Sequence, residues 1–104
     1  MKYIANAFSL NMLEQLSCSI HVKEIPVASA MTLAVDYASV VGHPDTAAVF
    51  STVLRVPVSP NRATVALKPG DEVLVGQYRG PRMPEGCKTL PEGAKIDWCL
   101  VTIS

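Results

Sequence analysis

The chain has 104 residues, of which 49% are apolar, and its nine basic side chains balance nine acidic ones. We expect one domain over residues 1–104, because a chain of this length buries about two-thirds of its unfolded surface. Neutral charge without a run of Lys or Arg argues against binding to duplex nucleic acid. With no apolar run of about 18 residues and no signal-like start, we expect a cytoplasmic protein with no membrane partner.

The cysteines and histidines indicate neither a disulfide framework nor a metal site. Cys18, Cys87 and Cys99 cannot all pair, and their spacing contains no zinc-binding pattern. His21 and His43 lie far apart, and no H-E-x-x-H motif or paired acidic cluster accompanies them. We therefore predict reduced thiols, no metal and no cofactor.

The first third of the chain predicts two strands and a helix. Residues 3–8 mix aromatic and β-branched side chains, which is typical of a strand. Residues 19–23 alternate polar and apolar side chains, which predicts a strand with His21 on its exposed face. Pro26 suits the first turn of a helix, and the broad apolar set after it predicts a helix over residues 26–38.

The middle of the chain predicts a second helix and a hairpin. Pro44 suits a helix start, and apolar residues follow it at helical spacing as far as Leu54. Residues 63–67 alternate as a strand, and the turn centred on Pro69 and Gly70 predicts that they pair with a strand over residues 72–77.

The last third predicts a loop and a final strand. Residues 78–93 contain too many Gly and Pro residues for a helix or a central strand, and the segment is long enough to be functional. Residues 95–103 alternate as a strand. The predicted order is ββααβββ, which favours the α+β class with a single mixed sheet of about five strands and helices packed on it.

Polar side chains at the ends of these predicted elements are the candidates for function. Element ends display functional side chains, but they are also where polar residues ordinarily belong. The candidates are Asn6, Ser9, Asn11, His43, Arg62, Arg79, Arg82 and Glu85.

His43 stands directly before the second predicted helix and has two interpretations. Its ring can satisfy a nearby backbone group at the helix entry. Alternatively, an imidazole titrates near pH 6.5 and can protonate a leaving alkoxide at neutral pH. The helix amino terminus would attract a phosphate to the same place.

Each of the other candidate residues also has a structural and a functional interpretation. Loop arginines are commonly solvated surface charges, but a guanidinium also binds two phosphate oxygens at once. Glu85 is either an exposed carboxylate or a group that accepts a proton from a ribose hydroxyl or orients a cation. Asn6, Ser9 and Asn11 either cap a turn or hydrogen-bond the edge of an adenine.

Four strings of the sequence become informative when they are taken together. They are Asn6-Ala7-Phe8-Ser9-Leu10-Asn11-Met12, Gly42-His43-Pro44-Asp45-Thr46-Ala47, Asn61-Arg62 and Arg82-Met83-Pro84-Glu85-Gly86. This combination resembles the viral type III anti-CRISPR ring nucleases, whose cellular relatives are the CRISPR-associated ring nucleases. The resemblance runs from Tyr3 to Ile103, and N-A-F-S-x-N-M together with G-H-x-x-T is its specific part.

The resemblance implies a homodimer that cleaves cyclic tetra-adenylate, the second messenger of type III CRISPR immunity, without a metal. The products would be linear di-adenylates with 2′,3′-cyclic phosphates, and their formation would switch off CRISPR ancillary effectors. A protein of the same fold that binds the ring without cutting it is the alternative.

The resemblance also implies the site residues. The catalytic ones would be His43, Arg82 and Glu85. Arg79 remains an alternative to Arg82 as the arginine that faces the phosphate. Glu92 remains an alternative to Glu85 as the glutamate, because Pro-Glu-Gly occurs twice. The implied substrate contacts are Asn6, Ser9, Asn11, Arg62, Gln77 and Arg79.

Overall fold

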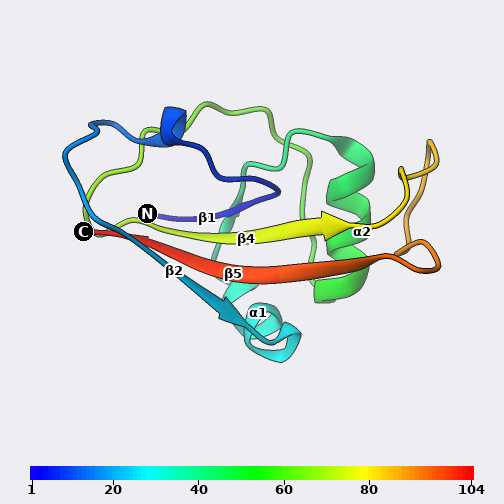
Figure 1. Cartoon of the computed structure of the whole chain (residues 1–104). Coiled ribbons are helices and arrows are strands. Elements are labelled where there is room, and N and C mark those ends of the chain that lie inside the picture. The colour runs from blue at the N-terminus through cyan, green and yellow to red at the C-terminus, as the bar shows by residue number, and fades with distance from the viewer.

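A computed structural model describes all 104 residues and contains one five-stranded mixed sheet in the order β2-β5-β4-β1-β3. Figure 1 shows β2, β5, β4 and β1 side by side in this order. Strand β1 pairs in parallel with both β3 and β4, whereas β5 pairs antiparallel with β2 and β4. The predicted α+β class and single mixed sheet are confirmed. The strands are β1 Lys2–Ala5, β2 Ile20–Ile25, β3 Ala38–Ser39, β4 Glu72–Arg79 and β5 Lys95–Ile103.

Two helices, α1 (Val27–Ala34) and α2 (Pro44–Leu54), and a 3₁₀ turn at Leu10–Met12 complete the fold. Pro44 is the first residue of α2, as its restricted backbone predicts. Helix α1 ends four residues before the predicted end at residue 38. The chain turns back at that point because Ala38 and Ser39 pair with β1 as the short strand β3, which the sequence does not predict.

The face of the sheet that α1 and α2 cover contains the larger of two hydrophobic clusters. At its centre the rings of Phe50 on α2 and Trp98 on β5 lie 4.9 Å apart at an interplanar angle of 60°. A Cβ added to Gly76 on β4 would lie 2.6 Å from the Phe50 ring and 2.5 Å from the Trp98 ring. Because Gly76 has no side chain, both rings can pack directly over β4.

The opposite face of the sheet is covered in part by irregular segments, and this corrects the predicted strand at 63–67. Leu67 is buried against this face and forms only an isolated parallel bridge with Leu13. Alternation of polar and apolar side chains shows that one side of a segment is buried. It does not show whether the segment pairs with a neighbouring strand or only packs on the face of a sheet. The predicted hairpin with residues 72–77 is therefore wrong, because β4 pairs with β1 and β5 instead.

The ends of the elements also differ from the predictions. Strand β1 stops at Ala5, so Asn6 to Phe8 leave the sheet. Strand β4 continues through Arg79, opposite Lys95, so the loop predicted for residues 78–93 runs from Gly80 to Ala94. His21 lies exposed on β2, as predicted. No helix is long and apolar enough to cross a lipid bilayer.

Candidate functional site

The parallel part of the sheet brings three segments to one edge. Strands β1, β3 and β4 run in the same direction, so their carboxyl ends lie at the same side. Asn6 follows β1, the segment that leads to His43 follows β3, and the loop Gly80–Ala94 follows β4. Ligands of sheets with parallel strands commonly bind outside these ends. We call the loop Gly80–Ala94 the site loop.

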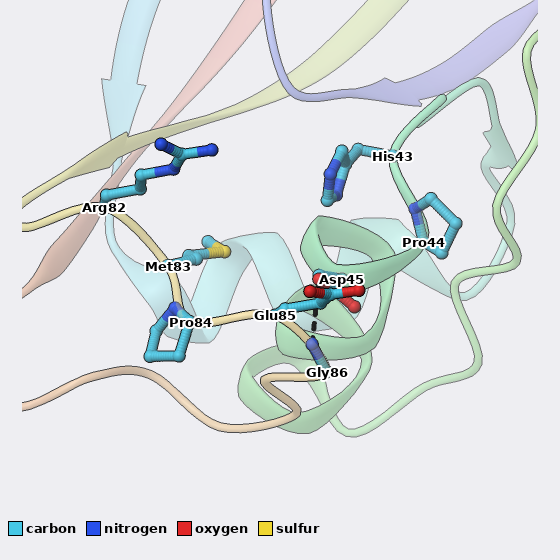
Figure 2. Close-up of a pocket in the computed structure, with 8 residues that line it drawn as sticks. All are labelled: His43, Pro44, Asp45, Arg82, Met83, Pro84, Glu85 and Gly86. Atoms are coloured by element: carbon cyan, nitrogen blue, oxygen red, sulfur yellow. Dashed lines mark hydrogen bonds between the residues drawn. The ribbon is translucent and has the colours of Figure 1, made fainter.

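An open cleft of about 850 Å³ lies between the site loop and the first turn of α2 (Figure 2). Eight residues line it, and the three residues that the resemblance implies as catalytic are among them. The lining residues are His43, Pro44, Asp45, Arg82, Met83, Pro84, Glu85 and Gly86.

His43 enters this cleft from the N-cap position of α2. Its backbone is extended, with φ −100° and ψ 123°, and its carbonyl accepts the Ala47 N–H at 3.0 Å. The exposed imidazole makes no capping hydrogen bond, so the interpretation in which the ring satisfies the helix entry does not apply. The ring is therefore available to a ligand at the positive end of the helix dipole.

Arg82 and Glu85 come from the opposite wall of the cleft, on the site loop. Both side chains are exposed, and neither forms a hydrogen bond or an ion pair within the chain. Figure 2 shows the Arg82 guanidinium extending toward the side on which His43 lies. A free guanidinium facing a free imidazole across open space is suited to a phosphate placed between them.

The two alternative site residues lie elsewhere. Arg79, on β4, forms an ion pair with Asp97 on β5, and Lys95 lies 3.6 Å from the same carboxylate. The hydrogen bond from Arg79 holds the pKa of the Asp97 carboxyl below its ordinary value. Neither Arg79 nor Glu92 lines the cleft, whereas Arg82 and Glu85 do.

The implied substrate contacts are distributed over other surfaces. Asn6 and Gln77 line a pocket of about 230 Å³ that also contains Val22, Val75 and Cys99. Asn6 and Asn11 line a neighbouring pocket of about 260 Å³. These residues are not brought into the cleft with His43 within one chain.

Ser9 and Arg62 take structural positions. Ser9 lines none of the pockets and precedes the 3₁₀ turn, where its carbonyl accepts the Met12 N–H at 3.0 Å. The Arg62 Nε–H donates to the Gly42 carbonyl at 3.1 Å. Arg62 thus supports the backbone directly before His43.

Sequence reasoning missed Asp45, which lines the cleft two residues after His43. Its carboxylate accepts the Gly86 N–H at 3.1 Å, shown by the dashed line in Figure 2. An acidic residue in the first turn of a helix is an ordinary dipole effect, so the sequence carries no signal that this one contacts the loop. No three His, Cys, Asp or Glu side chains gather as metal ligands.

The fold and the cleft define a class of protein: a mixed sheet with helices on one face and a polar cleft beside the ends of its parallel strands. A sequence model of the STIV B116-like family matches residues 2–97, and the chain belongs to this family. The solved structure of B116 of Sulfolobus turreted icosahedral virus is similar to it, with a TM-score of 0.81 and 25% identity over 97% of each chain. The expected membership of a viral family is thereby confirmed. The curated proteins include no match.

Proposed function

We propose that the chain is a ring nuclease that cleaves cyclic tetra-adenylate into linear di-adenylates without a metal ion. The observation that carries the proposal is the meeting of His43, Arg82 and Glu85 in one open cleft. The order of the motifs in the sequence is the second support, because it resembles the anti-CRISPR ring nucleases. In an infected cell this activity would switch off the effectors that the ring activates.

The chemistry needs few protein groups because RNA carries its own nucleophile. The 2′-hydroxyl attacks the adjacent phosphorus when it is held in line with the leaving 5′-oxygen, and a 2′,3′-cyclic phosphate forms. His43, as the imidazolium, gives its proton to the departing 5′-oxygen. Arg82 stabilises the charge that develops on the phosphoryl oxygens. Glu85 accepts the proton that the attacking 2′-hydroxyl releases, so one proton is taken up as His43 gives one away.

A homodimer is part of the proposal because the ring has a two-fold axis. An isologous dimer places the same side chains on opposite phosphates, so two cuts give two equal halves. One chain also leaves Asn6 and Gln77 in a pocket apart from the cleft. Val22, which lines that pocket, is 58% exposed.

The test is incubation of the protein with radiolabelled cyclic oligoadenylates of several sizes, with and without a chelator. We expect linear di-adenylate from the four-membered ring, at the same rate in both conditions. The His43→Ala variant should bind the ring, but its single-turnover rate should be roughly 10²- to 10⁴-fold lower than that of the wild type. His21→Ala, which removes the other exposed histidine, is the matched control.

Three results would contradict the proposal. A ring that is bound but stays intact would identify a binding protein that sequesters the messenger. A chelator-sensitive rate, or a normal rate in His43→Ala, would show that the mechanism is wrong even if the ring is cut.

A further inference from the structure

The site loop makes few hydrogen bonds with the rest of the molecule. Two hydrogen bonds join it to α2: the Gly86 N–H donates to the Asp45 carboxylate at 3.1 Å, and the Thr52 hydroxyl donates to the Lys88 carbonyl at 2.6 Å. Its other hydrogen bonds join loop residues to one another or to Tyr78 at the end of β4. Beyond Pro81, the hydrogen bonds that hold the loop to the rest of the molecule therefore all go to α2.

The acceptor Asp45 and the donor Thr52 lie on the same side of α2. Asp45 and Thr52 are seven residues apart on α2, which places them on one face of the helix two turns apart. The turn from Pro84 to Cys87 is closed by its own hydrogen bond of 3.1 Å and has Gly86 at φ +77°. The site loop thus presents a formed turn to Asp45 rather than an extended chain.

The hydrogen bond at Asp45 connects the two catalytic segments directly. The Gly86 N–H belongs to the same peptide unit as the Glu85 carbonyl, so its position fixes the backbone of Glu85. Asp45 itself is two residues from His43, within the first turn of α2. One charge-assisted hydrogen bond therefore sets the distance between the helix that carries the imidazole and the turn that carries the carboxylate.

We propose that Asp45 and Thr52 are positioning residues that fasten the site loop to α2 and so hold Arg82 and Glu85 across the cleft from His43. This inference rests on the proposed ring cleavage for its catalytic consequence, but not for its structural one. The side chains act on the reaction through the loop backbone, without contact with the reacting atoms.

Limited digestion with trypsin tests the structural consequence. Trypsin cleaves after Lys and Arg, and the site loop contains Arg82 and Lys88. Mass spectrometry should show that both sites are cut about tenfold faster in Asp45→Ala than in the wild type, the change expected for loss of a hydrogen bond to a charged group. In Thr52→Val, which loses a neutral hydrogen bond, the increase should be smaller. The melting temperature, measured in parallel, separates loop opening from global unfolding.

The chain offers matched controls for both variants. The Thr32 hydroxyl on α1 lies 3.3 Å from the carbonyl oxygen four residues before it, as the Thr52 hydroxyl does at 3.2 Å, but it has no loop carbonyl as a second acceptor. Asp36 is an exposed aspartate that lines no pocket. Thr32→Val and Asp36→Ala should be cut at the wild-type rate.

Ring cleavage tests the catalytic consequence. The single-turnover rate at saturating cyclic tetra-adenylate should fall about tenfold in Asp45→Ala. It should recover in Asp45→Asn, because the amide oxygen still accepts the Gly86 N–H. Wild-type trypsin rates in both variants, or an Asp45→Asn variant as slow as Asp45→Ala, would overturn the positioning role. If the wild type leaves the ring intact, the proposed function fails, while the trypsin rates still decide whether Asp45 and Thr52 fasten the loop.

Discussion

Arg82 and Glu85 line the cleft as exposed side chains without partners in the protein. A charged group that makes no internal contact contributes little to folding, so its loss should affect substrate chemistry rather than stability. Variants of these two residues therefore test which arginine, Arg82 or Arg79, takes part in the proposed reaction. They also test which glutamate does, Glu85 or Glu92.

We expect Arg82→Ala to lower the single-turnover rate of ring cleavage by roughly 10² to 10³, the usual cost of losing a transition-state donor. Glu85→Gln should lower the same rate while the melting temperature stays constant. Lys23→Gln and Glu14→Gln, which change exposed charges outside the pockets, are the matched controls. A larger loss in Arg79→Ala or Glu92→Gln than in the cleft variants would reverse the assignment.

The residues of the site differ in how far the sequence predicts them. His43, Arg82 and Glu85 are recognisable because their motifs are local strings. The choice between Arg82 and Arg79 needs the register of β4 with β5, which pairs Arg79 opposite Lys95 and beside Asp97. Asp45 needs the path of the site loop, and no local pattern encodes that path.

At the scale of elements, α2 and β5 are predicted almost to the residue because their signals are strong and local. Pro44 fixes the start of α2, and the alternation over residues 95–103 gives β5. Strand β3 has two residues, too few to show a period. The segment 63–67 has the period of a strand, but it packs on the face of the sheet instead of pairing within it. Only the tertiary structure reveals this.

The contact between α2 and the sheet depends on Gly76, and we expect Gly76→Ala to destabilise the protein. The new methyl group would overlap the rings of Phe50 and Trp98. Overpacking of this kind costs about 1–3 kcal/mol of the free energy of unfolding, which urea denaturation measures.

The double variant Gly76→Ala/Trp98→Phe provides the internal check. The smaller ring removes the overlap of the methyl group with Trp98 and leaves only the one with Phe50, so the double variant should lose less than the sum of the two single losses. Strict additivity would show that the overlap with Trp98 does not contribute to the destabilisation.

At the scale of the whole molecule, the proposed dimer predicts results that a monomer would not give. Sedimentation equilibrium should give the mass of two chains. When His43→Ala is mixed in excess with the wild type and subunits exchange, mixed dimers contain one working cleft and cut the ring once. Linear tetra-adenylate should then accumulate in place of di-adenylate.

The outcome that opposes the dimer is equally clear. If the wild type sediments as one chain while it cuts the ring twice, or if the mixture forms only di-adenylate, the two cuts do not come from two equivalent clefts. The functions assigned to Asn6 and Gln77, which lie apart from the cleft in one chain, would then need another explanation.

The packing of Phe50 against Trp98 has a practical consequence. Trp98 is the sole tryptophan of the chain, and its ring touches the helix whose first residues form the cleft. Intrinsic fluorescence excited at the indole therefore reports the docking of α2 on the sheet without any added label. A titration with nucleotide that shifts this emission would follow the movement of the helix, and stopped-flow recording would give its rate.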